Sequence, residues 1–135
     1  MATITSFEEI QAWQKARELT KIIYKTTRAK EFSDDYDLKK QIRRATVSIM
    51  ANIAEGFERG GTNEFVNFIS IAKGSTGEMQ SHLYVALDQE YISKDVFEKL
   101  YNEFKSIGKM LGSFMNYLNQ SDFKGTKYQN RITKK

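Results

Sequence analysis

A chain of 135 residues with 40% hydrophobic residues, 28% charged residues and a net charge of +4 is long enough for one folded domain with its own core. It contains no cysteine and a single histidine, His82, which excludes a disulfide framework and leaves no cluster of zinc ligands. Its apolar runs are too short for a membrane span and its N-terminus lacks the order of a secretory signal, so we expect a cytoplasmic protein.

The first expected helix covers about residues 7–29, in a chain that has no proline to interrupt it. Ser6 precedes this helix, and Glu9 three residues later completes the pattern of a capping box. Hydrophobic residues recur at helical spacing, at Phe7, Ile10, Trp13, Ala16, Leu19, Ile23 and Tyr24.

The second expected helix follows a short link and ends near Arg59. Three residues of the link are candidates to cap it, namely Ser33, Asp34 and Asp37. One face of the helix is apolar, at Leu38, Ile42, Ala45, Ile49, Ile53 and Phe57.

The same helix carries a second line of residues, which is polar and also has helical spacing: Arg44, Ser48, Asn52, Glu55 and Arg59. This line is either a solvated face or a set of buried contacts between helices or between subunits. Serine and asparagine are poor choices for a solvated helix surface, because their side chains compete with the helical backbone for hydrogen bonds. The composition therefore favours buried contacts.

Four basic side chains lie at positions i, i+1, i+4 and i+5 near the start of this helix: Lys39, Lys40, Arg43 and Arg44. They form one broad patch on the helix surface. The patch either pairs with the nearby acids Asp34, Asp35 and Asp37 or binds phosphate groups. The tyrosines of the chain do not follow the order of a platform for stacking bases, and we expect most of them to serve helix packing.

Gly60 and Gly61 end the second helix, because glycine adopts the left-handed cap conformation without steric cost, and Thr62 starts the third. The third helix is apolar at Phe65, Phe68, Ile69, Ala72, Met79, Leu83, Ala86 and Leu87. Gly74 and Gly77 lie inside it, where two glycines cost about 2 kcal/mol relative to alanine. This cost indicates either the close approach of a neighbouring helix or a kink.

Glu78 and His82 lie four residues apart on the third helix and could form an acid–base pair. Catalysis would also need a nucleophile or a substrate group within reach, and nothing near the pair in the sequence indicates one. We therefore interpret His82 as a structural or surface residue, and we predict no catalytic residue, no metal site and no cofactor.

The last helix begins after Ser93, which is its expected cap. Its hydrophobic residues alternate steps of four and three, at Val96, Leu100, Phe104, Ile107, Leu111, Phe114 and Leu118. Gly108 and Gly112 would let another helix approach. Because the links between the last three helices are short, neighbours run antiparallel. Residues 1–120 are thus predicted to form one all-α domain, an antiparallel up-down four-helix bundle.

The basic tail comprises residues 121–135. Five of the 21 basic residues and one of the 17 acidic residues lie in it, which leaves 16 of each sign in the rest of the chain. A tail of this composition is typically disordered, and it can also act as an arm that binds phosphate backbones. Its candidate contacts are Lys124, Lys127 and Arg131.

The blocks LKKQIRRATVSIMANIAEGFERGG and EFVNFISIAKGSTGEMQSHLYVAL, together with the first and last helices, resemble a known family. This is the family of four helix bundle proteins related to those encoded by intervening sequences of bacterial 23S ribosomal RNA genes. The similarity extends over about residues 6–119. The resemblance implies a ring-like homopentamer of antiparallel bundles and carries no catalytic residues. A more distant relative, the accessory protein of diversity-generating retroelements, binds nucleic acid and a reverse transcriptase through positive surface.

Two segments of the chain match the family's signatures. The signature of the second helix is matched by Arg43, Arg44, Ser48, Asn52, Glu55 and Gly56, and that of the third helix by Lys73, Gly74, Ser75 and Glu78. From these two signatures we assign seven residues to assembly: Ser48, Asn52, Glu55, Gly56, Gly74, Ser75 and Glu78.

The leading functional hypothesis is a non-enzymatic, homo-oligomeric scaffold that binds RNA or another nucleic acid weakly. Its candidate contacts are the basic tail and the patch of Lys39, Lys40, Arg43 and Arg44. The alternative is an adaptor that binds another protein, such as a polymerase or a phage component, without binding nucleic acid. An enzyme that uses Glu78 and His82 is a third and disfavoured hypothesis.

Overall fold

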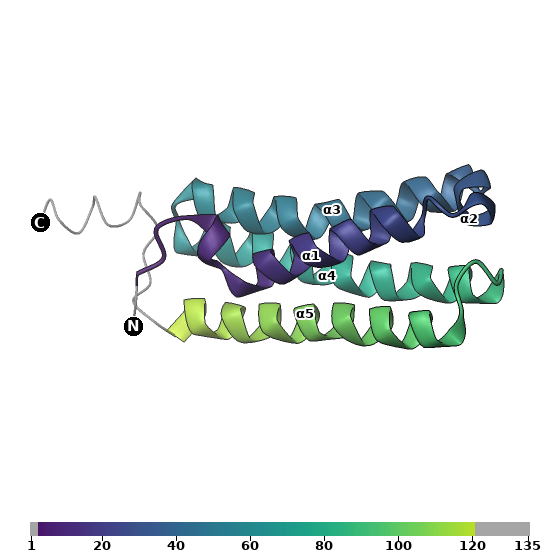
Figure 1. Ribbon diagram of the computed structural model, residues 1–135. Helices are drawn as coiled ribbons and strands as arrows, with labels where there is room; N and C mark the ends of the chain where they lie inside the picture. The colour runs from purple at the N-terminus through teal and green to yellow at the C-terminus, as the bar shows by residue number, and fades with distance from the viewer. Residues whose placement is uncertain (1–2, 121–135) are drawn as a thin grey trace, which may run out of the picture.

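The computed structural model describes residues 3–120, and every regular element within them is helical (Figure 1). The basic tail, with Lys124, Lys127, Arg131 and its predicted disorder, lies outside the described residues. The elements are the 3-10 helix η1 (Phe7–Glu9) and the α-helices α1 (Gln11–Thr26), α2 (Lys30–Asp34), α3 (Tyr36–Arg59), α4 (Thr62–Asp88) and α5 (Lys94–Gln120). Within this part of the chain, no helix combines the length and hydropathy that crossing a membrane requires.

The four long helices α1, α3, α4 and α5 lie side by side and alternate in direction along the chain (Figure 1). α4 packs most extensively, against α3 on one side and α5 on the other, while α1 completes the bundle by contacting both α3 and α5. This arrangement confirms the predicted all-α bundle. Assembly into a homopentamer and the division into a domain and a tail stay predictions.

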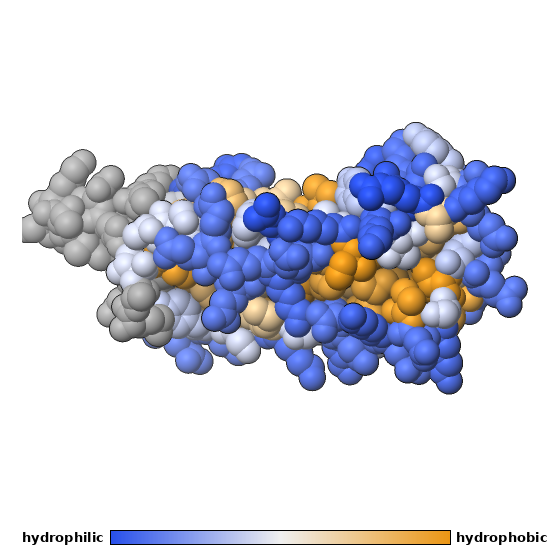
Figure 2. All heavy atoms as spheres, viewed as in Figure 1, coloured by the Kyte–Doolittle hydropathy of each residue, from blue (hydrophilic) through white to orange (hydrophobic). Residues whose placement is uncertain are grey.

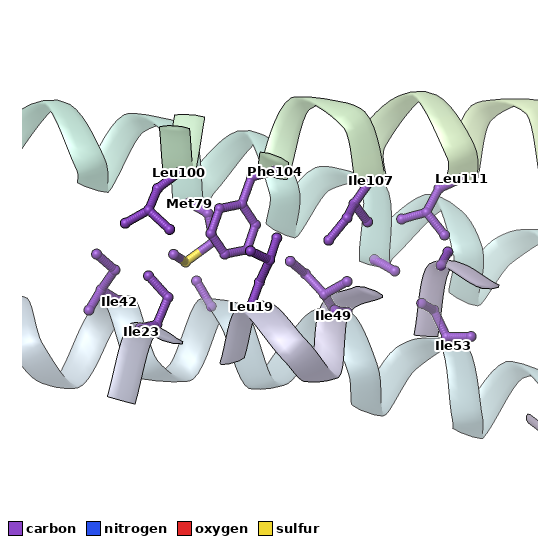
Figure 3. Close-up of a cluster of buried hydrophobic side chains, with 14 of the residues drawn as sticks. Leu19, Ile23, Ile42, Ile49, Ile53, Met79, Leu100, Phe104, Ile107 and Leu111 are labelled. Atoms are coloured by element: carbon purple, nitrogen blue, oxygen red, sulfur yellow. The ribbon is translucent and has the colours of Figure 1, made fainter. Parts of the chain in front are cut away.

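The core follows the predicted apolar line of α3, all of which is buried: Leu38, Ile42, Ala45, Ile49, Ile53 and Phe57. Figure 3 shows side chains of α3 meeting those of the other long helices, among them Leu19, Ile23, Met79, Leu100, Phe104, Ile107 and Leu111. At the start of α5 the predicted Val96 is 40% exposed, and Phe97 is buried in its place. Phe97 lies three residues before Leu100 and so continues the alternation of three and four into the core.

The first helix is shorter than predicted, since α1 begins at Gln11 and ends at Thr26. The predicted capping box does not form, because the Ser6 side chain makes no hydrogen bond that caps a helix. Instead, the Glu9 carboxylate accepts hydrogen bonds from the backbone amide of Thr5 and from the hydroxyls of Thr5 and Ser6. These bonds, that from the Thr5 hydroxyl above all, lower the pKa of Glu9.

The link between α1 and α3 contains the short helix α2, which the sequence analysis did not predict. Phe32 is 1% exposed and fixes α2 to the core. Asp35 caps α3 by accepting a hydrogen bond of 3.2 Å from the backbone amide three residues later. The three predicted caps are therefore wrong, because Ser33 and Asp34 lie within α2 and Asp37 lies within α3.

The glycines of α3 and α4 differ in what they do. Gly60 ends α3 with a φ of 82°, the left-handed conformation that was predicted. α4 runs through Gly74 and Gly77, and a β carbon added at either would meet no heavy atom within 4 Å. The predicted close approach at these two glycines is therefore wrong within this chain, because both are exposed.

At Gly108 the predicted close approach is confirmed, and α4 is the helix that approaches. A β carbon on Gly108 would lie 2.9 Å from Thr76 Oγ1, whereas one on Gly112 would lie in ordinary contact, 3.4 Å from Lys73 Cε. The absence of a side chain at Gly108 lets α4 and α5 pack closely.

Candidate functional site

A surface groove of about 500 Å³ lies between α1 and the first half of α3, near the end of the bundle that carries α2. We call it the cationic groove; its lining residues are Tyr24, Tyr36, Lys39, Lys40, Arg43, Arg44 and Val47. The groove brings together all four basic residues of the predicted patch. The six residues from α3 recur at steps of three and four, which places them on one side of the helix.

Arg43 is the most firmly held cation of the groove. Its Nε donates a hydrogen bond of 2.8 Å to Thr27 Oγ1, and its NH2 donates one of 3.3 Å to the backbone carbonyl of Tyr24. The guanidinium also lies 4.4 Å from the centre of the Tyr24 ring, well within the range of a cation–π contact. Arg43 thus ties the end of α1 to α3.

The other three cations are held more weakly. Lys39 Nζ donates a hydrogen bond of 3.3 Å to Ser33 Oγ, while Lys40 and Arg44 are exposed. The Tyr36 ring lies beside both lysines, with its centre 5.7 Å from Lys39 Nζ and 6.0 Å from Lys40 Nζ. These cations are therefore available to a ligand.

Two of the three acids near the groove, Asp34 and Asp35, have partners outside it. Asp34 pairs with Lys30 at 3.9 Å, and Asp35 accepts a hydrogen bond of 2.9 Å from the Tyr91 hydroxyl in addition to capping α3. Among residues 3–120, no carboxylate forms an ion pair with any of the four basic residues of the groove. The local ion pairing considered as an alternative is thus not found.

Tyr91 connects the link between α4 and α5 to the start of α3. Its ring packs against Phe32, with 5.2 Å between the ring centres. The hydrogen bond to Asp35 is the main cause that raises the pKa of Tyr91, and the negative charges of Glu31 and Asp34 add to it. These acids therefore act on the Tyr91 hydroxyl.

The polar line of α3 supplies contacts between helices of one chain. Ser48 Oγ lies 3.0 Å from Ser75 Oγ of α4, and Asn52 Nδ2 donates to the Ser48 carbonyl at 2.8 Å and to Ser48 Oγ at 3.0 Å. Glu55 and Arg59 form an ion pair of 2.7 Å on the surface. The contact is half-buried: Ser48 joins α3 to α4, whereas Asn52 hydrogen-bonds to Ser48 within α3.

The remaining assembly candidates fall into two groups. Gly56 is buried, and a β carbon added to it would lie 2.7 Å from Phe68 Cβ, so the glycine is needed for packing α3 against α4. Ser75 is 7% exposed and faces α3. Gly74 and Glu78 are exposed on α4. These two have the position that a contact with another chain requires, and the assembly role stays a prediction.

Glu78 and His82 do form the predicted pair, with 3.1 Å between Glu78 Oε2 and His82 Nε2. The His82 side chain is only 14% exposed, whereas that of Glu78 is 53% exposed. In the described part of the chain, no group of three or more His, Cys, Asp or Glu residues is arranged to hold a metal ion. The pair is a surface contact within one helix.

Sequence reasoning missed a second polar contact between helices. Thr20 Oγ1 of α1 lies 3.0 Å from Thr46 Oγ1 of α3, and Thr46 is fully buried. The signal that could have found it is the place of Thr46 next to Ala45, on the side of α3 that faces the core. A buried hydroxyl there needs a hydrogen-bond partner, either a carbonyl of its own helix or a group of another helix.

The comparison with known families decides which family the chain represents. The family described as 23S rRNA-intervening sequence protein matches residues 8–113, from η1 to most of α5. The chain belongs to this family. That membership confirms the resemblance carried by the second and third helices.

One solved structure extends the comparison to the fold. It is a crystal structure of a protein of unknown function from the S23 ribosomal protein family of Bacteroides thetaiotaomicron. The two chains share 26% sequence identity with a TM-score of 0.72, over 78% of this chain and 95% of the other. No curated protein matches the chain. Neither the description of the family nor that of the solved structure names an enzymatic activity.

Proposed function

We propose that this protein is a non-enzymatic, self-assembling helical scaffold of the cytoplasm that binds RNA weakly through the cationic groove. The observation that carries the proposal is the set of four cations on one wall of the groove, none of which is ion-paired with an acid among residues 3–120. The family description refers to a segment of a ribosomal RNA gene and is consistent with an RNA ligand. The tail residues Lys124, Lys127 and Arg131 stay candidate contacts.

The charges of the groove favour weak binding. Because Arg43 is already bound to α1, three cations per chain remain for phosphates, namely Lys39, Lys40 and Arg44. For a single strand, the logarithm of the binding constant falls with the logarithm of salt concentration by about 0.7 per neutralised phosphate. Three neutralised phosphates therefore give a slope of log K against log salt concentration near −2, that is about −0.7 for each phosphate. Several chains in one assembly would add avidity to such a weak site.

Assembly is proposed to use the exposed side of α4. Ile71 is 47% exposed and Val85 is 43% exposed, and Gly74 and Glu78 lie on the same side of the helix. We call these four residues the α4 outer face. Glycine at position 74 costs helix stability and meets nothing within this chain, which supports a close contact with a neighbouring chain.

Charge reversal tests the RNA-binding proposal. Binding of a fluorescently labelled RNA is measured by anisotropy at low salt for the wild type, for Lys40→Glu combined with Arg44→Glu, and for Lys105→Glu as an exposed control on α5. We expect the groove variant to lose most of its affinity and the control to lose little. Equal losses in both variants would show that the groove has no special role.

A protein adaptor without nucleic-acid binding is the second candidate. The exposed Ile71 and Val85 favour it, because hydrophobic side chains on a helix surface suit contact with another protein. Copurification from the native host separates the two candidates. The adaptor predicts a bound protein that is lost in an Ile71→Asp variant, together with no bound RNA.

A further inference from the structure

Tyr36 presents an open aromatic ring at the edge of the cationic groove. At 63% exposure it is the most exposed large hydrophobic side chain of the described residues. It is the first residue of α3, directly after the cap residue Asp35, so its backbone position is fixed by the start of the helix. The ammonium groups of Lys39 and Lys40 lie near the outer limit of a cation–π contact with the ring, so this contact holds them only weakly.

Tyr24 provides the contrast within the same groove. Its ring is covered by the Arg43 guanidinium at 4.4 Å, and this guanidinium is held in place by its hydrogen bond to Thr27. The groove therefore contains one covered aromatic ring and one exposed ring, and the exposed ring lies beside the ammonium groups of Lys39 and Lys40.

We infer that the groove binds an unpaired nucleotide of single-stranded RNA, with its base stacked on Tyr36 and its neighbouring phosphates paired with Lys39, Lys40 and Arg44. This inference rests on the proposed function and names the form of RNA that the site selects. Every base has a face that stacks on an aromatic ring, so the site does not require a particular sequence.

Double-stranded RNA cannot use Tyr36 in this way. Its bases are stacked on one another and it offers mainly phosphates and hydroxyls to a protein. The groove, at about 500 Å³, is in the size range of sites for small ligands, about 300–1,000 Å³. It is thus suited to one nucleotide with its phosphates, and the exposed tyrosine gives the single strand an advantage that charge alone does not.

The test compares two RNAs and four proteins. A labelled single strand of 12 nucleotides and the duplex of the same sequence are titrated with the wild type and with Tyr36→Ala, Tyr36→Phe and Tyr84→Ala. Tyr84 is a second exposed tyrosine, on α4, whose ring contacts Phe97 and Tyr101 rather than cations of the groove. Circular dichroism confirms that each variant is folded.

We expect Tyr36→Ala to weaken binding of the single strand about tenfold, which lies within the range measured for loss of one stacked base. Tyr36→Phe should stay within about twofold of the wild type, since the ring is kept, and Tyr84→Ala should bind as the wild type does. The duplex should bind Tyr36→Ala and the wild type equally well.

If Tyr36→Ala binds the single strand normally, or if it weakens the binding of both RNAs equally, this inference is wrong while the proposed function stands. If the wild type binds neither RNA at low salt, the proposed function and this inference are both wrong.

Discussion

Arg43 and Arg44 are adjacent in the sequence, but α3 directs them to different surroundings. Arg43 makes two hydrogen bonds and a cation–π contact with α1 and the residue after it, whereas Arg44 is exposed in the groove. We expect Arg43→Ala to lower the free energy of unfolding by about 1–2 kcal/mol, because both hydrogen bonds and the ring contact are lost. Arg44→Ala should change it by less than about 0.5 kcal/mol. Urea denaturation followed by circular dichroism measures both, and equal effects would contradict the assignment of Arg43 to structure.

Gly56 and Gly74 also allow a comparison of a buried position with an exposed one. A methyl group at Gly56 would collide with Phe68 and lie 3.0 Å from Phe65 Cδ1, so Gly56→Ala should destabilise the chain by about 1–3 kcal/mol. A methyl group at Gly74 meets nothing in the chain, so Gly74→Ala should stabilise it by about 1 kcal/mol through helix propensity. Thermal unfolding at protein concentrations that keep the chain monomeric measures both. A destabilising Gly74→Ala under these conditions would be inconsistent with the exposed position.

At the level of elements, the corner formed by α2, the start of α3 and the link between α4 and α5 depends on Asp35 and Tyr91. The pKa of Tyr91 is raised in the folded state, so its hydrogen bond stabilises the fold fully below the unfolded pKa near 10. That contribution is lost as pH rises through the folded pKa. Tyr91→Phe should therefore be less stable than the wild type at pH 7–9, and the difference should shrink above pH 10. Denaturation at a series of pH values checks this, and a difference that does not change with pH would argue against the bond.

The sequence predicted the long helices well because their apolar residues repeat at helical spacing over many turns. The line from Leu38 to Phe57 is buried as expected. The short helix α2 has too few residues to show a period, and it depends on the burial of Phe32 by distant parts of the chain. The cap of α3 was missed for a related reason. Acids occupy positions 34, 35 and 37, and which of them caps α3 depends on where α2 ends.

The grouping of residues in the candidate site could be predicted in part for the same reasons. The four cations belong to one helix, so their spacing alone places them on one face. The hydrogen bonds of Arg43 could not be predicted. Their acceptors, Thr27 and Tyr24, lie 16 and 19 positions away in the sequence and meet Arg43 only when α1 packs against α3. Tyr36 was not singled out, since exposure of one tyrosine among seven is a property of the folded chain.

For the whole molecule, hydrophobic surface remains exposed on the bundle. Figure 2 shows such surface between α1 and α5, toward the end that carries α2. The α4 outer face adds Ile71 and Val85. We predict that Ile71→Asp and Val85→Asp each reduce the mass of the assembly measured by light scattering. Ile22→Asp, at a residue of α1 that is 41% exposed, is the control and should keep the wild-type mass. An assembly that survives both α4 changes would exclude the α4 outer face as the contact.

The central claim is that the cationic groove binds RNA through its free cations, and the salt dependence of binding tests it most directly. The binding constant for a single-stranded RNA is measured over a series of salt concentrations for the wild type and for a variant with Lys39, Lys40 and Arg44 all changed to alanine. We predict that the wild type binds at low salt. The slope of log K against log salt concentration should be less negative for the variant, by about 2. Absence of wild-type binding at low salt, or equal slopes for the two proteins, would contradict the claim.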